Sequence, residues 1–518
     1  MFAAAGHFLR LFKIARTLAR HDALFPLDLL AVPKALATAL KLLTVFNRRH
    51  VNAAIPPGER LAHALEELGP TFIKLGQALA TRPDIAGDDV AEALTRLQDR
   101  LPPFPGAEAR AIIAAELGQP VDALFSAFND NAVAAASIAQ VHKAVTTDGV
   151  QVAVKVLRPG MREAFRRDLS TFFWFARLME RRVPDTRRLR PVEVAQTFAE
   201  TVALEMDLRY EAAAASELRE NMEGEPGFRV PRVMWPTTSE RVLTTEWIDG
   251  IPLGDRDALA AAGIDMNALA AVLVRVFLLQ VMRDGFFHAD LHQGNLFVDT
   301  EGNLVAVDFG IMGRLDRKSR RYLAEILRGF HTGNYRRIAE VHFEAGYVPR
   351  TKNINSFAQA LRAIGEPIAG RRVRDISFGR LLAQLFQITA TFEMRTQPQL
   401  LLLQKTMVMA EGLAMYMDPE INMWEVSPPV VQGWLADNMG PDAYIRETAE
   451  ATLSLLRYLP LIADELEKRA AVLTAEGIVL HPETARLIGE SQSRHLRSQG
   501  AALWVIAALL AVLIIILN

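Results

Sequence analysis

Hydrophobic residues recur at helical spacing along most of the chain, and short runs of alternating apolar and polar residues interrupt this pattern in the middle. Residues from about 20 to 120 are predicted to form helices, broken at "AIPPGER", "LGPTF" and "RLPPFPG". Short β-type runs occur between Ala132 and Gly250, around a long helix expected from about Arg162 to Glu220. Beyond Gly250 the pattern is helical, apart from the strand-like stretches "NLFVD" and "NLVAVDFG". The pattern predicts an α+β protein with a small β-containing lobe, a helical lobe and helical additions on both sides.

The C-terminal stretch "AALWVIAALLAVLIIIL", Ala501 to Leu517, carries no charged residue. As a helix it would span about 25 Å, slightly less than a ~30 Å hydrocarbon core. A buried helix of a soluble domain would keep a polar face, which this stretch lacks. Because Arg494, His495 and Arg497 precede it, we expect one transmembrane anchor with the body of the protein in the cytoplasm. The expected location is the bacterial inner membrane, or the mitochondrial inner membrane in a eukaryote.

The N-terminal stretch "MFAAAGHFLRLFKIARTLAR" is basic and amphipathic. It carries Arg10, Lys13, Arg16 and Arg20 and has no acidic residue before Asp22. Three interpretations stay open: a helix lying on a membrane surface, an organellar transit peptide, and a helix packed on the main domain. The stretch lacks an uninterrupted apolar run followed by a cleavage site, which disfavours secretion.

The composition excludes several kinds of site. The 518 residues include 58 basic and 60 acidic side chains, for a net charge of −2, so no global field favours nucleic acid as a partner. The chain has no cysteine, which rules out disulfides, thiolate metal sites and cysteine nucleophiles.

Polar residues are concentrated in the otherwise apolar stretch "FFHADLHQGNLFVD". Asn295 lies five residues after Asp290, and Asp308, which begins an Asp-Phe-Gly triplet, lies thirteen residues after Asn295. A protein-kinase catalytic loop has an acid near the attacking group, then an Asn and an Asp that bind metal, in this order. Asp290 is therefore the predicted catalytic acid or base. Asn295 and Asp308 are the predicted Mg²⁺ ligands, because this ion prefers oxygen donors.

The same stretch contains two histidines, His288 and His292, at the i, i+4 spacing of some zinc sites. The sequence "HADLH" lacks the glutamate of a zinc-protease helix, and a third ligand is not evident. The spacing from Asp290 to Asp308 favours the kinase-type interpretation.

A kinase-type site requires an upstream strand with a phosphate-binding lysine, and "GVQVAVKVLRPG" supplies a candidate. In a strand, Val152, Val154 and Val156 share one face and Lys155 lies on the other. Lys155 is thus predicted to bind ATP and to take part in catalysis. The alternative is an ordinary surface lysine on an edge strand.

Two further segments are predicted to contact ATP. In "RVLTTEWIDGIPL", Thr245 would be the gatekeeper, and the backbone of Glu246 and Ile248 would hold the adenine edge. "NAVAAASIAQVHKA" takes the place of a Gly-rich loop but has no glycine, and each added Cβ keeps the backbone farther from the phosphates. The alternative for this segment is an alanine-rich helix. Its predicted ATP-binding residues are Val133, Ala134, Ala135, Ala136, Ser137, Ile138, Ala139, Gln140 and Val141.

Four motifs together resemble the UbiB/ADCK (aarF-domain) family of atypical kinase-like proteins. They are "KLGQ" at Lys74 to Gln77, "AAASIAQVH", "LEMDLRYEA", and "HADLHQGN" with "DFG". The resemblance extends from about Leu61 to Pro419. It implies a bilobal protein-kinase-like fold with an N-terminal helical extension over the substrate side, ATP and Mg²⁺ as cofactors, and support of ubiquinone or related prenylquinone synthesis at a membrane.

The family motifs also predict ion pairs. Lys74 and Gln77 lie three residues apart on one helix face. Glu205 and Glu211 would lie about 240° apart on one helix, so we expect them to have different partners. We pair Glu211 with Lys155 and Glu205 with Lys74. Asp207 is expected to reach the metal or the same ion-pair network.

The chain also departs from related patterns. Family members often have two C-terminal hydrophobic segments, and this chain has one. Ala289 stands where most protein kinases have Arg, and no Ala-Pro-Glu segment follows Asp308. Three functions are therefore considered: an ATP-hydrolysing kinase-like enzyme, which is favoured, a true small-molecule or protein kinase, and a nucleotide-binding pseudokinase scaffold. The expected partners are membrane lipids, quinone-biosynthesis enzymes or lipid-like quinone precursors, and a second copy of the chain in a homodimer.

The expected organisation has six parts. They are a basic N-terminal segment (1–50), a helical extension with the KxGQ motif (51–125), a small lobe with inserted helices (126–250), a helical large lobe (251–425), a C-terminal helical region (426–500) and a transmembrane helix (501–517).

Overall fold

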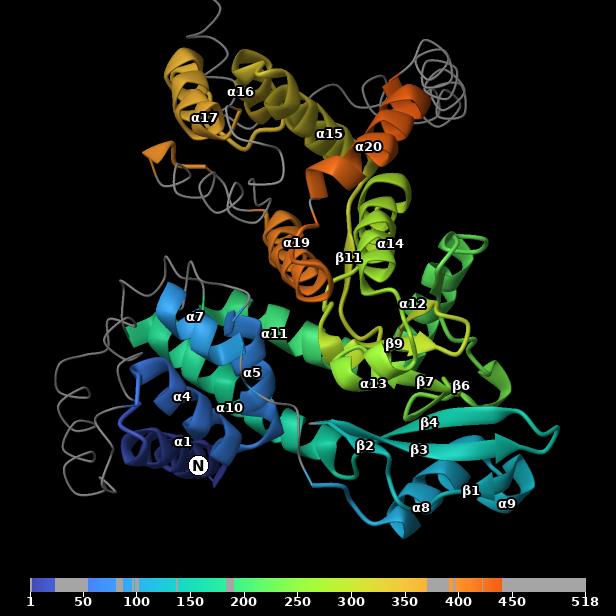
Figure 1. Ribbon diagram of the computed structural model, residues 1–518. Coiled ribbons are helices and arrows are strands. Elements are labelled where there is room, and N and C mark those ends of the chain that lie inside the picture. The colour runs from blue at the N-terminus through green and yellow to red at the C-terminus, as the bar shows by residue number, and fades with distance from the viewer. Residues whose placement is uncertain are drawn as a thin grey trace, which may run out of the picture. The chain divides into compact units, whose positions relative to one another are not determined.

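The computed structural model describes residues 2–23, 55–80, 87–95, 97, 102–136, 138–182, 191–369, 391–394, 397–421 and 423–439 (Figure 1). The chain divides into two units, Met1–Ala436 and Asp437–Asn518, and the following description concerns the first. The predicted transmembrane helix at 501–517 lies outside the described residues, as do residues 440–500 of the predicted region 426–500 and the predicted ATP contact Ser137.

In the described part of the N-terminal extension there are four helices: α1 (Phe2–Arg20), α4 (Pro57–Leu68), α5 (Pro70–Ala80) and α7 (Asp88–Thr95). Their apolar faces share a core that includes Leu61, Leu65, Phe72 and Leu94. Helix α1 packs on this group and on the later helix α10 (Met161–Arg182). Of the three interpretations of the N-terminal stretch, the structure therefore shows a helix packed on the main domain.

The small lobe contains an antiparallel sheet in the order β1–β3–β4–β6, with β2 also paired to β3. The strands are β1 (Phe125–Phe128), β2 (Ala134–Ala135), β3 (Ala139–Thr146), β4 (Gln151–Leu157) and β6 (Val242–Glu246), and helices α8 (Gly106–Leu117) and α9 (Val121–Leu124) precede them. The alanine-rich segment thus forms a hairpin, not the alternative helix. Ala134 pairs with Val141 in its register.

Strand β4 has the two faces that its sequence predicts. Val152, Val154 and Val156 are fully buried with Phe125 against α8, and Lys155 lies on the opposite face. The apolar face is packed and the lysine face is left for the site.

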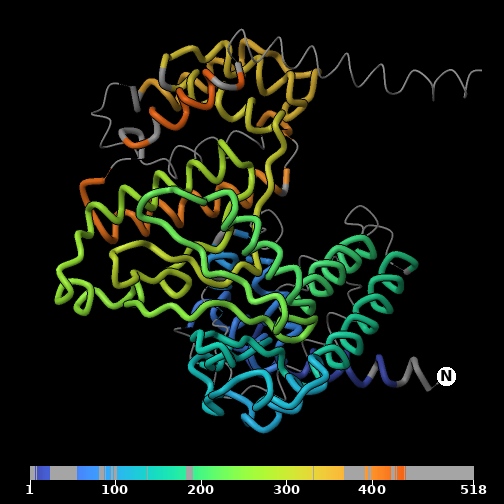
Figure 2. Tube along the Cα trace, turned by 90° about the vertical axis from the view of Figure 1, so that its right-hand side faces the viewer, coloured from blue at the N-terminus to red at the C-terminus, as the bar shows by residue number. Residues whose placement is uncertain are grey.

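The long helix expected from Arg162 to Glu220 is instead three helices: α10, α11 (Pro191–Glu205) and α12 (Leu208–Asn221). Helices α10 and α11 pack side by side (Figure 2). The chain leaves helical geometry at Asp207, whose carboxylate accepts the Arg209 amide at 3.1 Å and caps α12. A short side chain such as that of Asp can accept a hydrogen bond from a nearby backbone amide and so start a new helix instead of continuing the old one. The apolar periodicity did not reveal this helix boundary.

The large lobe begins with β7 (Gly250–Pro252), α13 (Arg256–Ala261) and α14 (Met266–Leu279), which continues as a π-helical turn (Gln280–Asp284). A second sheet has the order β5–β10–β9–β7, and β8 pairs with β11. The strands are β5 (Phe228–Arg229), β8 (Phe286–His288), β9 (Leu296–Asp299), β10 (Leu304–Ala306) and β11 (Met312–Arg314), with 3₁₀ turns at Trp235–Thr237 and Gln293–Asn295. Strands β9 and β10 confirm the two predicted strand-like stretches.

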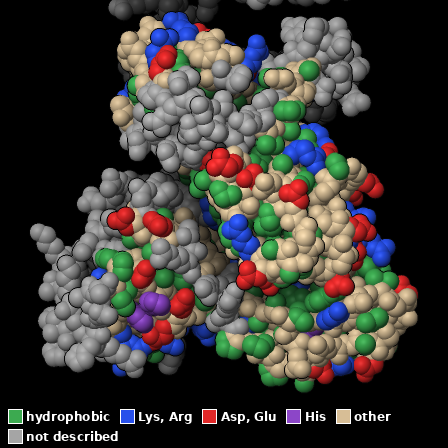
Figure 3. Space-filling view, in the orientation of Figure 1, with side chains coloured by type: hydrophobic (Ala, Val, Ile, Leu, Met, Phe, Trp, Pro, Cys, Tyr) green, Lys and Arg blue, Asp and Glu red, His purple; other side chains and the backbone are tan. Residues whose placement is uncertain are grey.

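The remaining helices among the described residues are α15 (Arg317–Thr332), α16 (Tyr335–Glu344), α17 (Ile354–Ala369), α19 (Pro398–Met417) and α20 (Met423–Met439). Helices α14 and α19 share the main core, which contains Leu273, Phe277, Leu403 and Met407. Within the described residues, one helical stretch is long and apolar enough to cross a membrane, Met266–Asp284, and more than half of it is buried in this core. On the face shown in Figure 3, acidic and basic side chains are interspersed over the described part of the surface.

Candidate functional site

The centre of the candidate site is an ion-pair chain between three elements. Lys155 on β4 lies 2.7 Å from Glu211 on α12 and 3.3 Å from Asp308, which follows β10. The predicted Lys155–Glu211 pair is confirmed. Burial lowers the pKa of Lys155, but the Asp308 and Glu211 carboxylates outweigh burial and raise this pKa, so the lysine keeps its charge.

Asp308 has a strained backbone and a strongly ionised side chain. Its φ is 63°, in the left-handed region that non-glycine residues rarely adopt. Its carboxylate also accepts the Gly310 amide at 3.3 Å. Withdrawal from bulk water raises the pKa of this carboxyl, but the attraction of Lys155 and the hydrogen bond from the Gly310 amide outweigh this effect and lower the pKa to about 2. Because 46% of the side chain remains exposed, an anionic oxygen is presented to any bound ligand.

The catalytic loop is held by its own polar groups. The buried ring of His288 accepts the Asp290 amide through Nδ1 at 3.2 Å, and burial lowers the His288 pKa, which keeps the ring neutral. The Asn295 amide nitrogen donates to the Asp290 carbonyl at 3.1 Å. The Val307 amide donates to the Asn295 carbonyl at 2.8 Å and brings the segment leading to Asp308 beside the loop. The structure therefore brings together the three residues that the spacing singled out.

The donor set fits Mg²⁺ bound to a nucleotide. The side-chain nitrogen of Asn295 is used within the loop, which leaves its oxygen as the atom for a metal, and Asp308 adds a charged oxygen. Mg²⁺ commonly takes one or two protein oxygens and completes its shell with phosphates and water. The zinc alternative gains no support, because the described residues contain no group of three His, Cys, Asp or Glu placed to hold a metal.

The expected adenine-binding segment lies beside Lys155. Thr245 is opposite Ala153 in the sheet, so it shares a face with Lys155, as a gatekeeper would. The Glu246 amide donates to the Arg232 carbonyl at 2.8 Å and is not available to a ligand. Among the described residues, no group accepts the Ile248 amide, which leaves it for a ligand. The nucleotide-binding roles of Glu246 and Ile248 stay predictions.

The alanine hairpin is held by hydrogen bonds of its own. The Val133 amide donates to the Val141 carbonyl, and the Ala136 amide donates to the Ala139 carbonyl, both at 2.8 Å. Outside the hairpin, Arg158 donates through its side chain to Ala136 and through its amide to Ile138. A contact of Ala135 with ATP stays a prediction, like those of the other residues in the hairpin.

The side chain of Gln140, a predicted ATP contact, lies away from Lys155. Gln140 pairs with Val156, so its side chain lies on the face opposite Lys155. There its amide bonds both backbone groups of Phe104, at 2.8 and 3.1 Å, and the His142 ring. The strand alternation of β3 turns this side chain away from the face that carries Lys155.

The KxGQ motif forms the one ion pair predicted for it. Lys74 on α5 lies 3.1 Å from Glu205 on α11, which confirms that pair. Gln77 lies on the same helix and is partly buried. The expectation for Asp207 is wrong, since its carboxylate caps α12 and pairs with the Arg209 side chain at 2.6 Å. The premise that Glu205 and Glu211 share one helix is also wrong, although their partners are as predicted.

A residue that the sequence reasoning missed also reaches the site. Lys405 on α19 places its Nζ 3.7 Å from Oδ1 of Asp290, and Nε2 of His292 lies 3.6 Å from Oδ2 of the same carboxylate. Lys405 is the only charged residue between Pro398 and Ala410. A single charged residue in an apolar helix could have indicated a functional lysine, but the sequence does not show which loop that helix contacts.

The two-lobed arrangement, the Lys155–Glu211 pair and the loop from Asp290 to Asp308 define a kinase-like protein. Residues 96–342 match the ABC1 atypical kinase-like domain, and residues 361–422 match the UbiB helical domain. The chain belongs to the UbiB family of atypical kinase-like proteins.

Several relatives resemble the chain over most of its length. "Probable protein kinase UbiB" of Marinobacter nauticus is 42% identical over 459 residues, 87% of this chain and 83% of the relative. The Serratia proteamaculans protein of the same name is 39% identical over 516 residues, 98% of this chain and 94% of the relative. Among solved structures, the Rv3197–erythromycin complex from Mycobacterium tuberculosis is 26% identical and covers 77% of this chain and 98% of its own, with a TM-score of 0.48.

Proposed function

We propose that this chain binds Mg-ATP and hydrolyses it, in support of ubiquinone or related prenylquinone synthesis at a membrane. The observation that carries the proposal is the charged set around Lys155, with Glu211 at 2.7 Å and Asp308 at 3.3 Å, beside a loop that presents Asp290. A scaffold that binds Mg-nucleotide without chemistry could use Asn295 and Asp308 but would have no need of Asp290. The link to quinone synthesis rests on the family to which the chain belongs.

The residues of the site would have separate roles in ATP hydrolysis. Lys155 contacts the phosphates of ATP and is itself held by Glu211. Asp290 orients a water molecule and takes its proton, while the water oxygen bonds to the γ-phosphorus and the bond from that phosphorus to the β,γ-bridging oxygen breaks. The products are ADP and inorganic phosphate, and the proton then passes to solvent. Mg²⁺, when bound by Asn295 and Asp308, would neutralise charge on the β- and γ-phosphates.

Two observations favour water over a protein as the acceptor. Only Leu315 and Asp316 separate the end of β11 from the start of α15 at Arg317, so little chain remains to hold a peptide after Asp308. Ala289 is fully buried where most protein kinases have an arginine that binds a phosphorylated loop. A true kinase acting on a small molecule or a protein is the second candidate.

Helix α1 supports membrane lipids as a partner. One face is held to the domain, with Arg10 2.7 Å from Asp168 and His7 stacked on Trp174. The other face exposes Leu9 by 72% and Phe12 by 52%, beside the exposed Lys13 and Arg16. Apolar and basic side chains at this spacing suit the surface of an anionic membrane. With an anchor at 501–517, the protein would lie on the cytoplasmic face of the bacterial inner membrane.

The test is phosphate release from Mg-ATP by the purified full-length protein, with and without liposomes containing anionic lipid. The proposal expects release that rises with anionic liposomes and falls to background in Asp290→Asn. Transfer of label from γ-labelled ATP to a lipid or protein would instead establish the kinase. Tight nucleotide binding without either product would establish the scaffold and refute the proposed hydrolysis.

A further inference from the structure

Lys405 reaches the catalytic loop from a helix that lies more than a hundred residues away in the sequence. Its Nζ is 3.7 Å from Oδ1 of Asp290. The two side chains are 27% and 28% exposed, so a ligand can approach both of them. The lysine comes from the stretch that matches the UbiB helical domain, and the aspartate comes from the kinase-like domain.

The position of Lys405 is fixed by its buried neighbour. Thr406 is fully buried, and its hydroxyl donates to the Leu402 carbonyl at 2.8 Å and lies 3.3 Å from the Ala289 carbonyl of the catalytic loop. Leu403 and Met407 pack in the main core on either side. The helix that carries Lys405 is therefore hydrogen-bonded to Ala289, the residue that immediately precedes Asp290.

The ammonium of Lys405 has donors to spare. The separation of 3.7 Å between Lys405 and Asp290 exceeds the length of an ordinary hydrogen bond. Asp290 therefore attracts the ammonium group of Lys405 without accepting a hydrogen bond from it. Lys155, the predicted phosphate ligand, lies between Glu211 and Asp308, whereas Lys405 lies beside Asp290. The alanine hairpin replaces the glycine loop whose amides would otherwise cradle phosphate. Among the described residues, none accepts a hydrogen bond from Lys405, so this cation has donors for a ligand next to Asp290, the expected point of attack.

We propose that Lys405 contacts the terminal phosphoryl group of ATP and stabilises the charge that develops on its oxygens during transfer. The proposal rests on the proposed ATP hydrolysis at this site and adds a residue from the helical domain to it. A fixed ammonium matters more in the transition state than in the ground state, because charge on the phosphoryl oxygens and the leaving group changes during transfer. The helical domain thereby completes the kinase-like site.

The test compares Lys405→Met, Lys405→Arg and the matched control Lys352→Met in the full-length protein with anionic liposomes. Lys352 lies between α16 and α17, where it forms an ion pair with Glu393 at 2.7 Å. We expect Lys405→Met to lower kcat about 100-fold, as loss of one oxyanion-stabilising donor does. Its KM for Mg-ATP and its Tm should change little. Lys405→Arg should keep a kcat of at least a tenth of that of the unmodified protein, and Lys352→Met should have the kcat of the unmodified protein.

A second measurement keeps the inference separate from the proposed hydrolysis. Binding of Mg-ADP with and without aluminium fluoride, a mimic of the transferred phosphoryl group, is measured by calorimetry. Lys405→Met should lose most of the tightening that fluoride causes, while binding of Mg-ADP alone stays unchanged. That result in a protein that releases no phosphate would refute hydrolysis and support the role of Lys405. Unchanged tightening, or unchanged kcat in a protein that does release phosphate, would overturn the inference.

Discussion

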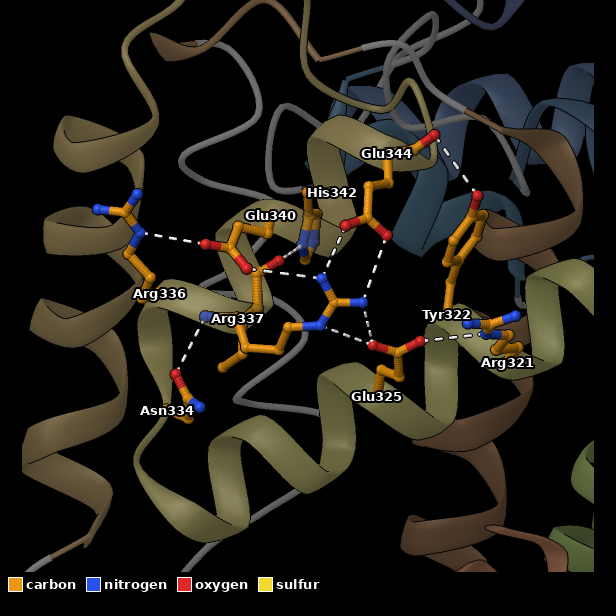
Figure 4. Close-up of polar contacts among 10 residues, drawn as sticks. Arg321, Tyr322, Glu325, Asn334, Arg336, Arg337, Glu340, His342 and Glu344 are labelled. Carbon is orange, nitrogen blue, oxygen red and sulfur yellow. Dashed lines mark hydrogen bonds and ion pairs between the residues drawn. The ribbon is translucent and has the colours of Figure 1, made fainter. Parts of the chain in front are cut away.

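Burial of His342 should make the stability of the α15–α17 helices fall as the pH is lowered. The ring is 2% exposed, its Nδ1 lies 2.8 Å from the Ile338 carbonyl, and the rings of Tyr347 and Phe357 contact it. Burial lowers its pKa from 6.5 to about 4. Figure 4 shows His342 on α16 near Arg337, which is already paired with Glu325 and Glu344.

The sign follows from proton binding in the two states. Between pH 6.5 and 4 the unfolded chain binds a proton at this histidine and the folded chain does not, so stability falls as the pH falls. Each pH unit is worth about 1.4 kcal/mol, so the 2.5-unit difference amounts to at most ~3.4 kcal/mol. Stability from this group is fully present above about pH 6.5.

The assay is urea unfolding at several pH values, with hydrogen exchange of α16 and α17 peptides, corrected for intrinsic rates, to locate the effect. His342→Leu removes the titrating ring and keeps an apolar side chain. Between pH 6.5 and 4, the slope of the unfolding free energy against pH should be smaller in the variant by about 1.4 kcal/mol per pH unit. Above pH 7 the two slopes should agree, which is the internal control. Parallel curves through the acid range would refute the reasoning.

Three further predictions concern the site. Asp308→Asn should weaken Mg-ATP binding by about 10-fold or more, because a charged metal ligand is lost, and calorimetry with and without Mg²⁺ will show whether the loss depends on the metal. Asp290→Asn should bind Mg-ATP nearly normally but lose phosphate release, and equal loss of binding in the two variants would contradict the separate roles. Ala134→Gly should change the preference between ATP and ADP more than Ala135→Gly, since the register places the Ala134 side chain on the Lys155 face. If neither glycine variant alters nucleotide preference, the hairpin does not cover the phosphates.

Local patterns in the sequence determined much of the site. The alternation in β4 fixed which face carries Lys155, because a strand turns successive side chains to opposite sides. The spacing of Asp290, Asn295 and Asp308 predicted their meeting, because a short loop and a hairpin leave few ways to connect them. The pairs Lys155–Glu211 and Lys74–Glu205 followed from motifs whose partners a family resemblance supplied.

Tertiary structure decided what local patterns left open. Asp207 could have continued a helix or capped a new one, and the packing of α11 and α12 on different neighbours selected the cap. Strand alternation places the Gln140 side chain opposite Lys155, but only the tertiary structure brings Phe104, a distant segment, to its amide. Lys405 reached Asp290 only because core packing of α19 on α14 brought its helix to the catalytic loop. Periodicity tells which side of a helix is buried, but the neighbour it meets depends on how the whole core is filled.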